Sequence, residues 1–278
     1  MLPEFASVIP ESIKNALTYL SSLENVKIFA GGTDLLVKMR RGESCSHIVD
    51  ITSIIDLKGI SEHDGLIKIG SISTHSEINR NQIINEKSPS LAQACGWVGS
   101  PAIRNMGTIG GNLVNASPAA DSLAPLLIHD ACVVLESKDT VRKINLNDFI
   151  LAPYKTTIYP HELLTAIEIR GFSGYREGYK RVTKRATWAI SRLSVAWAIR
   201  EVNGAYEDIR IAIGSCTPMP FRPKKIEESL KGVAKNDQTI QAAIEEILEE
   251  IKSISGIRPS FVYKIPVVKA LLEEILKG

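Results

Sequence analysis

Apolar positions in the first fifty residues follow two different periods. In residues 11–23 they recur every three or four positions, which predicts an amphipathic helix. Residues 26–30 and 47–51 are instead short runs that contain Val, Ile and Phe, and they predict strands. A second, short helix is expected after a pair of glycines, ending near Arg40. Helix, strand, helix and strand in this order indicate a small α/β unit with parallel pairing.

From residue 55 onward the pattern changes to a hairpin, several short helices and further strands. A polar stretch rich in glycine runs through residues 99–118, and we assign it no helix or strand. Around it we expect helices at 74–79, 89–98 and 122–129, and strands at 57–61, 66–71, 131–136, 141–146 and 163–170.

The last third of the chain is predicted to form three strands followed by helices. Asn203-Gly204 is a strong hairpin signal, because both residues tolerate a positive φ angle. Strands are expected at 175–184, 192–202 and 207–215, and helices at 236–254 and 261–276. We therefore expect an antiparallel sheet covered by a small helical layer.

The composition is typical of a folded globular chain. The 278 residues are 44% hydrophobic and 23% charged, which excludes a disordered chain, a collagen and a coiled-coil rod. The formal net charge is +2, so nucleic acid and anionic membranes are not expected as partners. No apolar run reaches the ~18 residues of a membrane span, and the first residues lack the features of a secretory signal. We therefore expect a cytoplasmic protein.

Cysteine and histidine offer no metal site by their spacing. The four cysteines are Cys45, Cys95, Cys132 and Cys216. No two of them stand in a C-x-x-C spacing, whereas zinc and iron–sulfur sites need several closely placed thiolates. His75 and His161 have no second ligand at a suitable distance in the sequence, and we interpret both as structural. Any iron–sulfur cluster that works with this protein is expected on another chain.

Two glycine pairs carry the clearest chemical signal. Gly31-Gly32 follows a predicted strand and precedes a predicted helix, and Gly110-Gly111 lies within the polar stretch. Consecutive glycines let the backbone approach a ligand closely, and a helix N-terminus favours a pyrophosphate. Neither G-x-G-x-x-G nor G-x-x-x-x-G-K-[ST] occurs, so the Rossmann and P-loop patterns are absent. One such pair is most often a tight turn, but two of them favour a phosphate-binding cleft.

The sequence around both glycine pairs resembles one protein family. Residues 30–36 (AGGTDLL) and 107–113 (GTIGGNL) are similar to two motifs of the FAD-binding medium subunit of molybdenum hydroxylases. This family includes carbon monoxide dehydrogenase, aldehyde oxidoreductase and xanthine dehydrogenase. Further matches are residues 116–121 (ASPAAD), 162–168 (ELLTAIE), 179–181 (YKR) and 184–186 (KRA). The resemblance therefore covers essentially the whole chain.

The resemblance implies an α+β fold in three parts. Residues 1–54 would form an N-terminal α/β lobe and residues 55–170 a second α+β lobe. Together they would make a two-lobed FAD-binding fold of the vanillyl-alcohol-oxidase or PCMH type. Residues 171–278 would form a C-terminal domain with a three-stranded antiparallel sheet and a helical bundle. The changes of pattern near residues 55 and 170 agree with this division.

The resemblance also implies which residues hold FAD. The first glycine loop would wrap the pyrophosphate and its flanking sugar, and the second would form the other half of the cradle. Asp121 would accept hydrogen bonds from the cofactor, and Val98 would pack near the isoalloxazine ring. The full set is Ile28, Phe29, Ala30, Gly31, Gly32, Thr33, Asp34, Leu35, Val98, Thr108, Gly110, Gly111, Asn112, Asp121, Leu164 and Lys180. No catalytic acid, base or nucleophile is assigned, because the reactive chemistry belongs to the cofactor.

Several of these residues also have ordinary structural interpretations. Asp34 and Asp121 are suited to capping the helices that follow them. Leu164 equally fits a core position on a strand. Lys180 belongs to a run of charges that is typical of a solvated face or of a subunit contact.

In function, the resemblance implies an electron-transfer subunit that binds FAD. A small partner subunit with two-iron two-sulfur clusters would pass electrons to the flavin, and a large partner subunit would carry the molybdenum cofactor and the substrate chemistry. Two such heterotrimers would form a dimer, and Lys180 would stabilise the reduced flavin. The alternatives are a stand-alone FAD oxidoreductase of the same fold and a scaffold subunit without flavin.

Two departures from the family pattern bear on substrate and electron acceptor. Thr33-Asp34 stands where carbon monoxide dehydrogenases of this family carry His-Ser, which favours aldehyde- or purine-type enzymes. We expect an aldehyde. Thr187 precedes Trp188 where many relatives have an acidic residue, so the final electron acceptor stays open.

Overall fold

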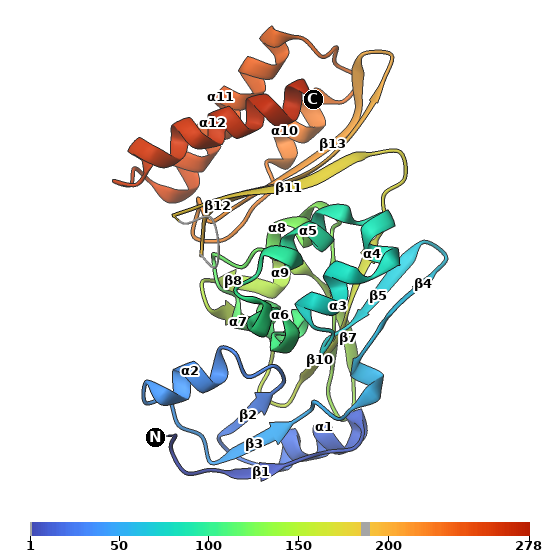
Figure 1. The fold of residues 1–278 in the computed structure, drawn as a ribbon, viewed down its shortest axis with the longest axis vertical. Helices are drawn as coiled ribbons and strands as arrows, with labels where there is room; N and C mark the ends of the chain where they lie inside the picture. The colour runs from blue at the N-terminus through green and yellow to red at the C-terminus, as the bar shows by residue number, and fades with distance from the viewer. Residues whose placement is uncertain (1, 185–189) are drawn as a thin grey trace.

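The three larger sheets, each with its own helices, follow one another along the long axis of the molecule (Figure 1). The computed structural model describes residues 2–184 and 190–278. The N-terminal unit lies at one end, the C-terminal sheet and helices lie at the other, and a helix-rich middle unit separates them (Figure 1). The α+β class expected from the sequence is confirmed.

The N-terminal unit is a parallel sheet with strand order β1-β3-β2. Its elements are β1 (Ala6–Val8), α1 (Ile13–Ser22), β2 (Val26–Phe29), α2 (Leu35–Arg40) and β3 (His47–Asp50). The Ser12 side chain accepts a hydrogen bond from the backbone N–H of Asn15 and so begins α1. The expected parallel pairing is confirmed. Strand β1 was not expected, because three residues are too few to show a period of two.

The middle unit is built on an antiparallel sheet with strand order β4-β5-β10-β6-β7. The strands are β4 (Ile60–His63), β5 (Leu66–Gly70), β6 (Cys132–Glu136), β7 (Val141–Asn145) and β10 (Leu163–Arg170), and β8 (Ile150–Ala152) with β9 (Lys155–Thr156) forms a separate small hairpin. The helices are the 3₁₀ turn Ile55–Leu57, α3 (His75–Arg80), α4 (Gln82–Lys87), α5 (Pro89–Trp97), α6 (Pro101–Met106), α7 (Ile109–Asn115), α8 (Leu123–Ile128) and α9 (Leu146–Phe149). Side chains from these helices and from the sheet form the largest buried cluster.

The C-terminal unit is the antiparallel sheet β11-β12-β13 with helices on one face (Figure 1). Its elements are β11 (Arg176–Thr183), β12 (Ser191–Val202), β13 (Ala205–Gly214), α10 (Lys224–Leu230), α11 (Asp237–Ser255) and α12 (Phe261–Lys277). Helices α5 and α8 of the middle unit contact the sheet as well. Asn203 and Gly204 both adopt left-handed φ angles at the β12–β13 turn, as expected for this hairpin.

The polar stretch at residues 99–118 differs from expectation, because it forms helices α6 and α7. Each helix begins at a hydroxyl residue whose side chain accepts a backbone hydrogen bond three residues on: Ser100 from Ile103, and Thr108 from Gly111. Both helices are too short to show a full apolar period. Their local signal is therefore the cap, not the hydrophobic pattern.

Within residues 2–184 and 190–278, the helices all fall short of the length and apolar character required to cross a membrane.

Candidate functional site

A cleft of about 270 Å³ lies between the N-terminal unit and the middle unit. The two glycine loops form facing parts of its wall, although about 75 residues separate them in the sequence. The predicted site residues that line it are Ile28, Ala30, Gly31, Gly32, Thr33, Asp34, Leu35, Val98, Thr108, Gly110, Gly111, Asn112 and Leu164. The fold therefore brings most of the predicted set together.

The first glycine loop lines the cleft with consecutive backbone N–H groups that have no partner in the protein. In the part of the chain that the structure describes, the N–H groups of residues 31–34 donate to no protein acceptor. Gly32 adopts a left-handed φ of 68°, which reverses the chain between β2 and α2. Adjacent free N–H groups beside a ligand cleft form an anion-binding concavity.

Gly31 allows the two loops to touch. A methyl group at this position would lie only 2.1 Å from the carbonyl oxygen of Met106, directly before the second loop. Only glycine fits such a contact without moving one of the two backbones. The close approach of the loops fixes the width of the cleft at this point.

The second glycine loop lets its backbone pack closely against neighbouring backbone, and its N–H groups at residues 109–111 are already bonded within the protein. It forms the first turn of α7, where the N–H groups of Ile109 and Gly110 donate to Ser73 and Ser71, and that of Gly111 donates to Thr108 Oγ1. A methyl group at Gly110 would lie 2.7 Å from the Ser71 carbonyl oxygen. The glycines of this loop therefore keep α7 against β5 and leave room in the cleft.

The cleft has polar and apolar sections. Lys27 forms an ion pair with Glu43 across 2.6 Å, and Lys38 Nζ donates to Asn115 Oδ1 across 2.7 Å, joining α2 to the end of α7. Val98 and Leu164 belong to the apolar lining, with Leu164 placed beside an irregularity in the β10–β6 pairing. A charged group and a flat ring system would both find complementary surfaces here.

The alternative capping roles of the two aspartates are not supported. The Asp34 carboxylate makes no capping hydrogen bond to α2 and lies in the cleft lining. The Asp121 carboxylate likewise does not cap α8. Leu164 is 3% exposed, so it serves both as a core residue and as part of the cleft wall.

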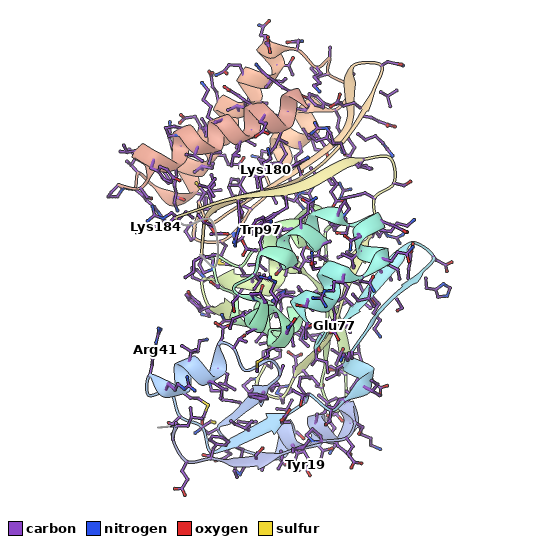
Figure 2. The ribbon with its side chains drawn as sticks, viewed as in Figure 1. Tyr19, Arg41, Glu77, Trp97, Lys180 and Lys184 are labelled. Atoms are coloured by element: carbon purple, nitrogen blue, oxygen red, sulfur yellow. The ribbon has the colours of Figure 1, made fainter. Side chains whose placement is uncertain are left out.

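Three predicted residues lie outside this cleft. Phe29 packs beneath the first loop, where its ring would lie 2.4 Å from a methyl group at Gly32. Lys180 pairs with Glu274 of α12, on the side of the C-terminal helices (Figure 2). Because side chains alternate along a strand, the neighbours of Lys180 in β11 face the middle unit, and Lys180 faces the other way. Its role as a cofactor contact stays a prediction.

Asp121 lies in a buried network between the middle and C-terminal units. It accepts hydrogen bonds from Tyr179 Oη at 2.6 Å, from Ser191 Oγ and from Arg181 Nη1 at 3.0 Å. Burial raises the pKa of the Asp121 carboxyl, although these hydroxyls and the guanidinium act in the opposite direction. The structure gives Asp121 three protein partners, and its contact with a cofactor stays a prediction.

His75 is the site residue that sequence reasoning missed. We expected a structural histidine, but its side chain lines the cleft at the start of α3. Burial, followed by the nearby Arg104 guanidinium, lowers the pKa of His75 to about 4, so the imidazole is neutral at pH 7. The sequence held no signal for this position, because the cleft forms only when β5, α3 and the two loops pack together.

The chemistry of the cleft matches a dinucleotide carrying a flavin. The free N–H row suits a pyrophosphate, the tight glycines suit close backbone approach, and the apolar section suits a planar ring. Among the described residues, no group of three or more His, Cys, Asp or Glu is placed to hold a metal ion. Thr187 and Trp188, which bear on the electron acceptor, lie outside the described residues. Fold and site thus define a two-lobed flavin-nucleotide-binding protein.

Comparisons with known proteins agree with this class. Residues 3–169 match the family described as "FAD binding domain in molybdopterin dehydrogenase", and residues 178–278 match "CO dehydrogenase flavoprotein C-terminal domain". The chain is 33% identical to the glyceraldehyde dehydrogenase medium chain of Sulfolobus acidocaldarius, over 99% of this chain and 98% of that protein. It is 29% identical to the xanthine dehydrogenase FAD-binding subunit of Escherichia coli, over 95% of this chain and 92% of that protein.

A solved structure with the same fold is the carbon monoxide dehydrogenase of Hydrogenophaga pseudoflava that lacks the Mo-pyranopterin moiety of its cofactor. The TM-score is 0.89 at 27% identity, covering 100% of this chain and 96% of that one. The chain therefore belongs to the family of FAD-binding medium subunits of molybdenum hydroxylases. The resemblance, the fold class and FAD as the cofactor of this chain are confirmed.

Proposed function

We propose that this chain takes electrons from iron–sulfur clusters of a small partner subunit and passes them through FAD to an external acceptor. FAD supplies an electron carrier that accepts electrons singly and releases them in pairs. The observation that carries the proposal is the row of free N–H groups at residues 31–34, which line a cleft with an apolar section. The protein's part is to bind, orient and shield the flavin.

The residues of the cleft divide this work between them. The N–H groups of residues 31–34 would hold the pyrophosphate, and the α7 turn would limit how far it enters. Val98 and Leu164 would contact the isoalloxazine ring with apolar surface and exclude water from that face. The Lys38–Asn115 hydrogen bond would keep the two lobes together over the bound cofactor.

The architecture supports a shared complex and not a complete enzyme in one chain. The proposal places the molybdenum cofactor and the substrate chemistry on a large partner subunit, with two heterotrimers forming a dimer in the cytoplasm. The three units, residues 1–54, 55–170 and 171–278, would serve as two FAD-binding lobes and a C-terminal domain. The similarity over nearly the full length of medium chains supports this division of labour.

An aldehyde is the proposed substrate of the complex. The glyceraldehyde dehydrogenase medium chain, at 33% identity, supports this choice, as does Thr33-Asp34 in the first glycine loop. With the complete complex, an aldehyde such as glyceraldehyde is expected to bleach the flavin absorption, whereas a purine or carbon monoxide is not. Bleaching by a purine alone would assign the complex to the xanthine type.

The first test is a visible absorption spectrum of the purified chain, followed by identification of the flavin it releases. A yellow protein that releases FAD at about one per chain is the expected result, because the cradle holds a pyrophosphate. Release of FMN would contradict the pyrophosphate assignment, since FMN has a single phosphate. A folded, colourless chain that takes up no added FAD would instead indicate a scaffold subunit.

A further inference from the structure

His75 occupies a position where both glycine loops meet. Its backbone N–H donates to the Gly107 carbonyl oxygen at 3.0 Å, which ties the start of α3 to the second loop. A methyl group at Gly107 would lie 3.3 Å from His75 Cδ2 and 3.5 Å from Thr33 Oγ1. The imidazole therefore lies beside the loop whose N–H groups are free, and it forms part of the same cleft wall.

The His75 ring lacks a partner that its burial demands. The residue is 2% exposed, and its Nδ1 atom has no hydrogen-bond partner among the described residues. Buried polar atoms without a partner are rare in folded proteins unless a ligand or water completes them. Neither ring nitrogen of His75 forms a hydrogen bond with the described residues, and Nδ1 is fully enclosed, so Nε2 is the ring atom that a ligand in the adjoining cleft can reach.

A second buried histidine in the same unit shows what a purely structural role looks like. His129 is 3% exposed, but its Nε2 lies 2.6 Å from Ser88 Oγ and 3.1 Å from Glu177 Oε1, and its Nδ1 lies 2.8 Å from the Arg170 carbonyl oxygen. Both of its ring nitrogens are therefore satisfied by protein. The ring nitrogens of His75 have no such partners among the described residues, and its side chain lines the cleft.

The charges around His75 favour an anion as that ligand. Arg104 of the packed helix α6 lowers the pKa of the ring through its positive charge, and its Nη1 donates to the Val98 and Gly99 carbonyl oxygens. Glu77 of α3 is engaged by the Thr74 N–H and by Lys58. The charged side chains of the N-terminal unit that line the cleft are Lys27, Lys38, Asp34 and Glu43. Of these, Lys27 and Glu43 neutralise each other. An incoming anion would complement the free N–H row, and its negative charge would offset the effect of Arg104 on the ring.

We propose that His75 is a binding residue for the phosphate groups of the dinucleotide and that it takes up a proton when they bind. The inference rests on the proposed function and adds a residue and a proton to it. A neutral imidazole offers one N–H donor, and a bound phosphate nearby favours the doubly protonated ring with two donors. The proton comes from solvent or buffer and ends on the ring nitrogen that carries no hydrogen in the neutral imidazole.

The sign of the resulting pH dependence follows from linkage. The pKa of His75 is about 4 in the free chain and is raised by the anion in the complex. Binding of FAD is therefore tighter at pH values below the pKa of the complex, and this extra affinity is lost as pH rises through it. A chain without the imidazole does not gain this extra FAD affinity at low pH.

The experiment uses the flavin-depleted full chain and titrates it with FAD in a calorimeter at pH 6 and pH 7, in two buffers of different ionisation enthalpy. The variants are His75→Leu and the conservative His75→Asn, with the exposed His161→Asn as matched control. At pH 6 we expect His75→Leu to bind FAD about tenfold more weakly and to lose the proton uptake, because a charge-assisted hydrogen bond is removed. His161→Asn should match the parent chain.

Each other outcome has a definite meaning. Unchanged FAD affinity and proton uptake in His75→Leu would overturn the inference while leaving the proposed function intact. Weaker binding with undiminished proton uptake would assign the loss to shape and would also overturn it. Should His75→Leu fold incorrectly, the same FAD affinity and proton uptake are measured on His75→Asn. Its amide keeps a donor but cannot take up a proton, so the proton uptake should be lost. If the parent chain itself binds no FAD, the proposed function fails and not merely the role of His75.

Discussion

At the scale of single residues, the site depends on places where a side chain would not fit. Gly31 is the clearest, because a methyl group there would meet the Met106 carbonyl oxygen at 2.1 Å and push the two loops apart. The three atoms nearest to that methyl group, Met106 O, Met106 C and Gly107 Cα, all belong to the backbone, so none can turn away as a flexible side chain could. Gly31 is therefore required for the contact between the two loops and not for a turn within one of them.

We predict that Gly31→Ala loses most of its FAD, because the loops can no longer approach each other. The measurement is the flavin-to-protein ratio after reconstitution and gel filtration. Gly42→Ala is the matched control: its φ of 106° is strained for alanine, but nothing lies within 4 Å of the added methyl group. Gly42→Ala should cost about 1 kcal/mol of stability and leave the flavin ratio unchanged. Full flavin content in Gly31→Ala would show that the close approach is dispensable.

At the scale of an element, the alternation of strand β11 decides which charges matter. Arg181 faces the middle unit, where its guanidinium is 6% exposed, bonds Asp121 and lies over the Trp97 ring at 5.1 Å. Lys180, one residue earlier, faces α12 and pairs with Glu274 at the surface. Figure 2 labels Lys180 on the side of the C-terminal helices. Adjacent cations on one strand therefore have opposite environments.

Removing the buried cation is expected to cost much more than removing the exposed one. Arg181→Met should lower the free energy of unfolding by about 3–5 kcal/mol, because it leaves the Asp121 carboxylate buried without its counter-charge. Lys180→Met should change it by no more than about 1 kcal/mol. Urea denaturation measures both. The double variant Arg181→Met with Asp121→Asn should recover part of the loss. Equal losses for Arg181→Met and Lys180→Met would refute the difference between the buried and the exposed cation.

The same Lys180→Met variant tests the role that the family resemblance implies. Since Lys180 pairs with Glu274 on the far side of β11, we expect the midpoint potential of bound FAD to stay unchanged. A lower potential would mean that the cation does stabilise the reduced flavin. Redox titration with the flavin absorption as readout distinguishes the two results.

At the scale of the whole molecule, a charge cluster joins the middle unit to the C-terminal unit. Asp130, which follows α8, accepts from Arg222 Nη1 at 2.7 Å and from Arg210 Nη1 at 2.8 Å. The same two guanidinium groups also bond the Leu127 and Ile128 carbonyl oxygens at the end of α8. Burial acts to raise the pKa of Asp130, but these cations outweigh it and hold the pKa below its usual value.

The cluster predicts an acid-dependent contribution to stability. Because the folded-state pKa of Asp130 is lowered, its contribution is present above the unfolded value of about 3.9 and is lost as pH falls through the folded value. Asp130→Asn, which tolerates the left-handed φ of 47° at this position, should cost about 1 kcal/mol at pH 7, since the carboxylate is partly exposed. Its difference from the parent chain should shrink below pH ~4. Thermal unfolding measures this, with exposed Asp139→Asn as control. A difference that stays constant from pH 7 down to the lowest pH at which both chains are folded would exclude the charge as its cause.

Local sequence determined the long helices, the longer strands and the nature of the two loops. Helix α11 has apolar residues at helical spacing, and the β12–β13 turn has a dipeptide that suits its geometry, so both were predictable from neighbours in sequence. The same held for the glycine pairs, because consecutive glycines signal close backbone approach wherever they occur. Helices α6 and α7 were not predicted, because each is too short to show a full apolar period. Their sequence signal is the capping residue at each N-terminus.

Only the tertiary structure decided which side chains share the cleft and which do not. Hydrophobic packing brings residues 31–34 and 108–112 together across about 75 positions, and the same packing places His75 between them. It also turns Lys180 toward α12 and encloses Asp121 among Tyr179, Ser191 and Arg181. Sequence patterns report periods and turns along the chain, whereas contacts between distant segments depend on how whole sheets and helices pack.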